Sequence, residues 1–216
     1  EGMKKTRTRT HNDRHSDDIV IHLRCGDILY GHESYHLMTL KYFIYVLDRI
    51  FEQTNSSVKQ QNTYIISQTS GKGSHRKEDA ESIGNCRQLV FAFQNKLSEH
   101  YANRSVQIRF ELVNNDIIND FALMMYAPNL VCGTSTFCLH AALANPYGRV
   151  FLPDLGPWDF LTKHLNEIVK SAVLPPTHSI VRVEANNWFL RTNDISQRQW
   201  HKRGNFSQLI VYLLSH

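Results

Sequence analysis

One segment near the N-terminus, Ile19-Val-Ile-His-Leu-Arg-Cys-Gly-Asp-Ile-Leu29, carries the clearest sign of the architecture. Its first five residues, Ile19–Leu23, form a short apolar run rich in β-branched side chains, which is typical of a strand buried on both faces of a sheet. Arg24 ends the apolar run, and Gly26 and Asp27 follow it. The segment therefore predicts a buried strand that ends in a charged loop.

Outward from this segment, strand and helix patterns alternate along the chain. Apolar residues at helical spacing predict helices, and short apolar or alternating runs predict strands. The predicted helices are Tyr35–Phe51, Glu78–Tyr101 with Gly84 as a candidate break, Asp116–Tyr126, Thr136–Ala144 and Phe206–Leu214. The predicted strands are Ile19–Leu23, Thr63–Ser67, Val106–Leu112, Leu130–Cys132 and Arg149–Leu152, with weaker alternating or apolar runs at Ser179–Val183 and Trp188–Leu190. This alternation predicts an α/β fold, a Rossmann-like parallel sheet with helices on both faces.

The composition fits a globular protein with a sizeable core. The chain has 216 residues, of which 42% are hydrophobic and 20% are charged. Residues 1–18 are polar and basic and are interpreted as a linker or tail, with a phosphate-attracting arm as the alternative, and residues 19–216 as one Rossmann-like domain. No apolar run approaches the ~20 residues of a membrane-spanning helix. The net charge of +4 is too small to predict nucleic-acid binding, but it fits an anionic ligand.

Cysteines and sequons give little information on the compartment. The four cysteines are Cys25, Cys86, Cys132 and Cys138. They are too few for a disulfide-scaffolded mini-protein, no CxxC pair predicts a zinc site, and the pairing of Cys132 with Cys138 stays open. The three Asn-x-Ser sequons are Asn55, Asn103 and Asn205. They favour secretion only slightly, because about two such sequons are expected by chance at this composition.

The first predicted strand delivers polar side chains to its carboxyl end, where parallel sheets bind their ligands. Arg24 offers a planar fork of donors that matches phosphate oxygens. Gly26 allows the backbone to approach a ligand closely, and Asp27 is able to orient Arg24 or to accept a proton from a substrate hydroxyl. The alternative is an internal ion pair between Arg24 and Asp27, with His22 as a core histidine.

A second junction follows the predicted strand Leu130–Cys132. Gly133, Thr134, Ser135 and Thr136 lead into a helix, so that hydroxyl groups and backbone N–H groups meet at a helix N-terminus. Such groups bind an anion, although simple N-capping by Ser135 or Thr136 is the alternative. Together, the two junctions place an arginine and a hydroxyl-rich helix start on one sheet, which favours a diphosphate ligand.

These residues resemble the fucosyltransferase superfamily of GT-B glycosyltransferases, which includes α-1,2-, α-1,6- and protein O-fucosyltransferases. The family signature, His-x-Arg-x-Gly-Asp after a strand, appears here as His22-Leu-Arg-Cys-Gly-Asp27. A second pattern, an Asp in a helix, an apolar strand and a Ser/Thr-Phe helix start, appears as Asp120, Leu130–Cys132 and Ser135-Thr-Phe137. With the tail Asn145–Pro153, the resemblance covers roughly Ile19 to Pro153.

The resemblance implies the C-terminal, donor-binding half of an inverting glycosyltransferase, which moves a sugar from a nucleotide-sugar, normally GDP-fucose, to a hydroxyl of a glycan or glycoprotein. Arg24 would be catalytic, because it would contact the β-phosphate and stabilise the leaving diphosphate. The other donor-binding residues would be His22, Gly26, Asp120, Ser135, Thr136 and Phe137, of which His22 and Asp120 would recognise the guanosine. No metal or other cofactor is implied, because Arg24 and a helix dipole replace the divalent cation.

The catalytic base is less uniform in this family than the donor site. Asp27 is the first candidate, and His32 and Glu33 in the same loop are the other candidates on the acceptor side, although both are as easily read as plain loop residues. Cys25 stands where many members carry a second basic residue, which leaves fewer charges for the phosphates and leaves the donor sugar open. Each GT-B half needs about 150–200 residues, so we expect an N-terminal acceptor-binding domain outside this chain.

Two alternatives remain open at this point. The same fold could use another nucleotide-sugar, as a xylosyltransferase does, or the chain could be a non-catalytic module that binds carbohydrate or nucleotide. A P-loop hydrolase is set aside, because no glycine five residues before Gly71 completes a Walker motif around Ser70–Ser74. The sequence leaves the compartment open, with the lumen of the Golgi as the interpretation for a eukaryotic source and the cytoplasm otherwise.

Overall fold

The computed structural model describes residues 18–25, 28–29, 36–53, 60–67, 77–104, 107–113, 116–156, 162–164, 166–167, 179–185, 188–191, 198 and 205–215. The basic segment 1–17 lies outside these residues. Asp18, the last residue assigned to that segment from the sequence, is buried, and its carboxylate accepts a hydrogen bond from the Asn62 side chain. None of the described helices is both long and apolar enough to cross a membrane.

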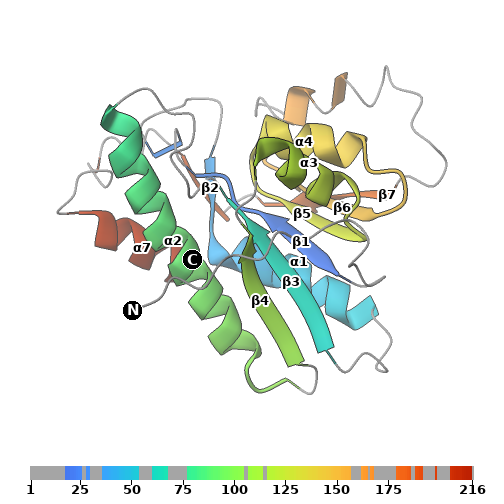
Figure 1. The fold of residues 1–216 in the computed structure, drawn as a ribbon, viewed down its shortest axis with the longest axis horizontal. Coiled ribbons are helices and arrows are strands. Elements are labelled where there is room, and N and C mark those ends of the chain that lie inside the picture. Colours follow the sequence, from blue (N-terminus) through green and yellow to red (C-terminus); the bar gives the residue numbers. More distant parts are fainter. Residues whose placement is uncertain are drawn as a thin grey trace.

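The centre of the described structure is a six-stranded sheet in which all strands are parallel (Figure 1). The strands in chain order are β1 (Ile19–His22), β3 (Gln60–Ile66), β4 (Gln107–Val113), β5 (Asn129–Cys132), β6 (Arg149–Asp154) and β7 (Ser179–Glu184). In space they lie in the order β4-β3-β1-β5-β6-β7. Along the chain, β3 and β4 are added on one side of β1. The chain then returns to the centre of the sheet, and β5, β6 and β7 are added on the other side. This is the strand order of doubly wound Rossmann-like sheets, and it confirms the predicted fold class.

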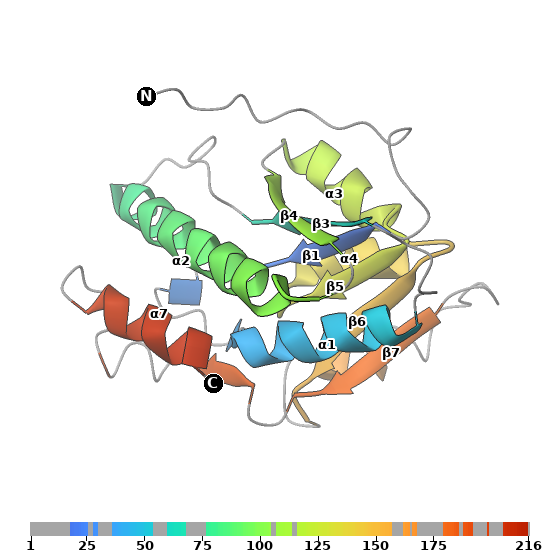
Figure 2. The same ribbon diagram turned by 90° about the horizontal axis from the view of Figure 1, so that it is seen from below.

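Helices cover both faces of this sheet, as the views in Figures 1 and 2 show. On one face lie α1 (Leu40–Gln53), α2 (Lys77–Tyr101) and α7 (Phe206–Ser215), and on the other lie α3 (Ile117–Met125) and α4 (Thr136–Leu143). The change of face follows from chirality, because right-handed crossovers place helices on opposite faces when the strand order reverses direction.

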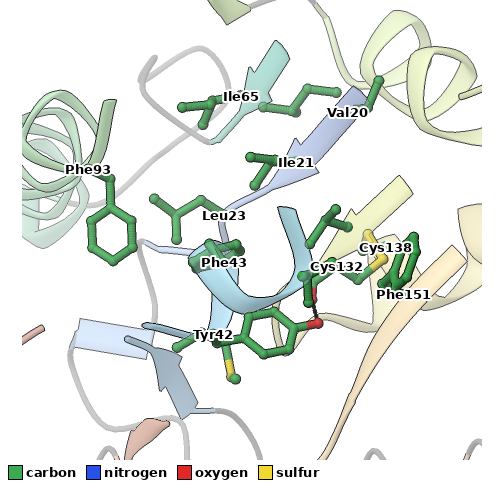
Figure 3. Packing of buried hydrophobic residues seen from close by; sticks show 14 of the residues in the cluster. Val20, Ile21, Leu23, Tyr42, Phe43, Ile65, Phe93, Cys132, Cys138 and Phe151 are labelled. Carbon is green, nitrogen blue, oxygen red and sulfur yellow. Dashed lines mark hydrogen bonds between the residues drawn. A yellow bond between two sulfur atoms is a disulfide. The ribbon is translucent and has the colours of Figure 1, made fainter. Parts of the chain in front are cut away.

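The core forms where α1 and α2 pack on the central strands. The face that α1 turns toward the sheet is fully apolar apart from one hydroxyl, and Phe43 on this face meets Phe93 of α2 edge-on at 5.7 Å between ring centroids. Tyr42 is also fully buried, and its hydroxyl donates a hydrogen bond of 2.9 Å to the carbonyl of Cys132 at the end of β5 (Figure 3). Burial raises the pKa of Tyr42 far above its ordinary value. This contact positions α1 against the end of β5.

The structure corrects the sequence analysis at the start of the first predicted helix. His36–Met38 form a strand, β2, which pairs antiparallel with β8 (Phe189–Arg191), and α1 begins only at Leu40. The spacing of Leu37 and Leu40 fits a helix, but both side chains are also buried when Leu37 lies in a strand. The partner strand is about 150 residues away in sequence, which local periodicity does not register.

Candidate functional site

The carboxyl ends of β1 and β5 meet at the point where the strand order reverses. The two strands are neighbours, with His22 opposite Cys132 in the register. Beyond this pair, the backbone N–H of Gly133 donates a hydrogen bond of 2.9 Å to the His22 carbonyl. A Cβ atom on Gly133 would stand 3.2 Å from that carbonyl oxygen, so the glycine allows a close approach of the two segments. Ligands of doubly wound sheets bind at such a switch point.

Arg24 and Ser135, one from each predicted junction, are brought together here. The Arg24 Nη1 atom lies 3.4 Å from the Ser135 hydroxyl oxygen. Ser135 is buried and caps α4, since its hydroxyl oxygen also accepts a long hydrogen bond, 3.4 Å, from the backbone N–H of Cys138. A guanidinium therefore lies at the N-terminus of a helix, and both features attract an anion.

His22 lies beside this pair with a neutral ring. Desolvation by burial lowers its pKa to about 3, and the positive charge of Arg24 adds to the shift. Within the described residues, its Nδ1 atom has no hydrogen-bond partner. The ring centroid lies 6.0 Å from that of Phe137 in the first turn of α4, and Phe137 in turn lies 5.4 Å from Phe121 of α3. The site thus combines a cation, a helix N-terminus, a neutral imidazole and an aromatic wall.

Thr134 fixes the position of the segment between β5 and α4. The Thr134 side chain is buried, and its hydroxyl accepts a hydrogen bond of 3.1 Å from the His36 N–H and donates one to the His36 carbonyl. His36 stacks on Phe189 of β8, with 4.9 Å between ring centroids. The small β2–β8 ribbon is therefore attached directly to the segment that carries Ser135. Thr134 appeared in the sequence only as one of several hydroxyls, and its partner was not predictable from local pattern.

Two disulfides border the site. Cys25, directly after Arg24, is bonded to Cys86 of α2, and Cys132 is bonded to Cys138 across the segment that contains Ser135. Figure 3 shows the second pair among the core residues. The sequence left this pairing open, although the even number of cysteines was the available signal. Cys25 thus has a structural role at the position where the resemblance leads one to expect a basic residue.

The other predicted site residues are partly described. Asp120 lies half-buried in the first turn of α3, next to Phe121, on the same face of the sheet as α4. Thr136 is half-buried as the first residue of α4, and its carbonyl is 2.7 Å from the His140 ring. Gly26, Asp27, His32 and Glu33 lie outside the described residues. Within the described part of the chain, no group of three or more His, Cys, Asp or Glu side chains is arranged to hold a metal ion.

Comparison with known proteins does not identify a family for this chain. No protein-family model, no curated protein and no solved structure matches the chain. The fold and the arrangement of residues at the switch point are therefore the basis for a functional proposal.

Proposed function

We propose that this chain is the donor-binding half of an inverting glycosyltransferase that moves a sugar from a nucleoside diphosphate sugar to a hydroxyl of a glycan or glycoprotein, with GDP-fucose as the favoured donor. The observation that carries the proposal is the contact between Arg24 and Ser135 at the switch point of the sheet. A donor diphosphate carries its negative charge in the form that a guanidinium fork and a helix N-terminus bind.

In the proposed reaction, the acceptor oxygen attacks the anomeric carbon, the bond from that carbon to the diphosphate breaks, and the acceptor proton passes to a base. Charge develops on the leaving diphosphate, and Arg24 and the N-terminus of α4 supply fixed positive charge to stabilise it. These groups take the part that a divalent cation takes in other transferases. Asp27 remains the first candidate for the base, followed by His32 and Glu33.

His22, Asp120 and Phe137 are proposed to hold the nucleoside. The His22 Nδ1 atom has no partner among the described residues, and the neutral ring has one donor and one acceptor nitrogen for a polar base edge. A buried polar atom without a partner costs free energy, which a ligand that bonds to it would recover. Phe137 and Phe121 supply an apolar surface beside it.

The test is calorimetric titration of the protein with GDP, UDP and GDP-fucose, with EDTA present throughout. We expect GDP to bind without metal, and Arg24→Ala to weaken binding on the order of tenfold to a hundredfold, because a charge-assisted hydrogen bond contributes about 1.5–3 kcal/mol. Arg109→Ala is the matched control, because Arg109 is exposed on the edge strand β4 and its removal should leave affinity unchanged.

The other outcomes decide against parts of the proposal. Preference for UDP would keep the transferase and replace fucose by another sugar such as xylose. Equal binding by wild type and Arg24→Ala would contradict the role of the switch-point arginine. No binding of any of these nucleotides would favour a non-catalytic module. With an acceptor-binding half supplied, Arg24→Ala should lower transfer on the order of a hundredfold or more, since a transition-state contact of this kind contributes about 3 kcal/mol.

A further inference from the structure

The turn after α2 presents a sequon to solvent. Asn103-Arg104-Ser105 is an Asn-x-Ser sequence, and Asn103 is exposed in the turn that follows Tyr101, the last residue of α2. The turn is closed by the backbone, with the N–H of Arg104 donating a hydrogen bond of 3.2 Å to the carbonyl of Tyr101. Within the described residues, the Asn103 carboxamide takes part in no hydrogen bond.

The neighbouring side chain, Arg104, contacts the body of the fold. Arg104 turns back to the fold, where its Nη2 atom lies 2.7 Å from a carboxylate oxygen of Asp48 and its guanidinium lies 4.8 Å from the centre of the Tyr101 ring. The Tyr101 hydroxyl donates to the same carboxylate oxygen at 2.9 Å. The turn is therefore anchored through Arg104, while Asn103 is exposed.

Asn205, the other sequon asparagine among the described residues, is less accessible. Asn205 is half-buried at the start of α7, where its carbonyl accepts a hydrogen bond from the Gln208 N–H, and Phe206 beside it is 3% exposed. A glycan on Asn205 would have to be accommodated beside the buried Phe206 side chain, which packs α7 onto the fold. Asn55 lies outside the described residues.

The cysteines indicate the compartment in which such a sequon meets its modifying enzyme. Both disulfides join residues of this chain, and together they use all four cysteines. Disulfides form and persist in oxidising compartments such as the lumen of the endoplasmic reticulum, and are rare in the cytosol. N-linked glycans are added to secreted chains on surface loops that carry this sequence.

The position of Asn103 is also compatible with the candidate site. Asn103 precedes β4 and so lies at the amino edge of the parallel sheet, whereas Arg24 and Ser135 lie at the carboxyl edge. A bulky polar group at this turn would leave the switch point open.

We propose that Asn103 is a site of N-linked glycosylation, and that the protein matures in the lumen of the secretory pathway. The co-substrate is an oligosaccharide linked to a polyprenyl diphosphate. The Asn103 Nδ2 atom forms a bond to the anomeric carbon of the first sugar, the bond from that carbon to the diphosphate breaks, the amide loses one proton, and the polyprenyl diphosphate leaves. This inference is independent of the transferase proposal.

The experiment expresses the chain behind a cleavable secretion signal in eukaryotic cells. The Asn55→Gln/Asn205→Gln variant retains Asn103 as its single sequon. We expect a peptide-N-glycosidase to lower the mass of this secreted variant, and mass spectrometry of the digested protein in heavy-oxygen water to show conversion of Asn103 to labelled Asp. Adding Ser105→Ala should abolish the shift, whereas adding Ser105→Thr should keep it.

Folding is checked independently of the glycan by titrating free thiols, because correctly folded chains have none. A secreted chain with no free thiol and an unmodified Asn103 would overturn the proposal. A chain that reaches the lumen but keeps its four thiols reduced would overturn it as well, since the disulfides are the basis for the compartment.

Discussion

His22 is buried at the carboxyl end of β1, where the residue is 7% exposed and its Nδ1 atom has no hydrogen-bond partner within the described residues. Burial of this kind disfavours the charged form, and the neighbouring Arg24 charge disfavours it further, so that the pKa falls from 6.5 to about 3. The fold therefore accepts a neutral histidine at a place where a protonated one would be costly.

This histidine makes the stability of the protein sensitive to acid. Between the unfolded pKa near 6.5 and the folded pKa near 3, the unfolded chain binds a proton that the folded chain does not bind, so the free energy of unfolding falls as the pH falls through this range. From about pH 7 to about pH 5, His22 should account for a loss of about 2 kcal/mol. Urea unfolding of the wild type and of His22→Gln at both pH values measures the difference.

The control for this prediction is the pH dependence that remains in His22→Gln, which reports all other titrating groups together. A variant as acid-sensitive as the wild type would show that His22 is protonated in the folded protein. A ligand that donates a hydrogen bond to Nδ1 would compete there with the proton, so its binding should be lost at a pH low enough to protonate the ring.

Sequence alone predicts the residues of this site better than it predicts their contacts. Arg24 and Ser135 each follow an apolar strand, and the rule that ligands bind at carboxyl ends places both at one edge of the sheet. The contacts of Thr134 with His36, and of Cys25 with Cys86, join segments far apart in the chain. Local spacing holds no information on such partners, so these contacts required the structure.

At the scale of elements, α2 shows how weak a single glycine signal is. Gly84 suggested a break in the pattern, yet the helix continues from Lys77 to Tyr101. The residue lies on the exposed face of the helix, and a Cβ atom built on it would meet nothing within 4 Å. The neighbouring Cys86 is bonded to Cys25, and Leu89 and Val90 are buried in the core. Tertiary contacts, rather than intrinsic helix propensity, therefore keep this turn helical.

Replacement of Gly84 by alanine should therefore stabilise the protein. Alanine is favoured over glycine in a helix by about 1 kcal/mol, and no neighbouring atom opposes the added methyl group. For a chain of this size, the gain corresponds to a rise in Tm of about 2–4 °C. Calorimetry measures the shift, and an unchanged or lower Tm would mean that the helix is frayed at this turn.

In the turn between α4 and β6, we expect replacement of a glycine, Gly148, by alanine to destabilise the protein. The carboxamide of Asn145 organises this turn, since its Nδ2 atom donates 2.8 Å to the Ala127 carbonyl while its Oδ1 atom accepts 2.6 Å from the Gly148 N–H. A Cβ atom on Gly148 would stand 2.0 Å from the Ala127 carbonyl oxygen. Backbone occupies the space that a side chain would need.

We expect Gly148→Ala to destabilise the protein by about 3 kcal/mol or more, because the turn has to move away from Ala127 and buried hydrogen bonds are lost with it. Chemical denaturation of Gly148→Ala, measured beside Gly84→Ala, separates steric exclusion from helix propensity. Equal stability of the two variants would contradict the packing described for this turn.

For the whole molecule, the order of the strands was within reach of sequence reasoning and the small ribbon was not. Alternating strands and helices, with right-handed crossovers, restrict the sheet to a few topologies, and the doubly wound order is one of them. The β2–β8 ribbon has three residues in each strand. The residues of β8 overlap the weak apolar run Trp188–Leu190, whereas those of β2 lie within the predicted helix Tyr35–Phe51, so the pairing of the two strands was not predicted. Short elements that depend on a distant partner are the part of a fold that periodicity misses.

The two disulfides offer the last test, because they cross-link the molecule over different lengths of chain. Cys25 and Cys86 are 61 residues apart, and Cys132 and Cys138 are 6 apart. If each bond acts by restricting the unfolded chain, the long loop contributes about 4 kcal/mol and the short loop about 2 kcal/mol. Removing the first pair as Cys25→Ala/Cys86→Ala should therefore lower the free energy of unfolding more than Cys132→Ala/Cys138→Ala does.

Nucleotide affinity should change in the opposite order, with the larger loss in Cys132→Ala/Cys138→Ala. The short loop contains Ser135 and loses its rigidity when its disulfide is absent. A short-loop variant that binds as tightly as the wild type would show that the Thr134–His36 hydrogen bonds alone hold this segment in place.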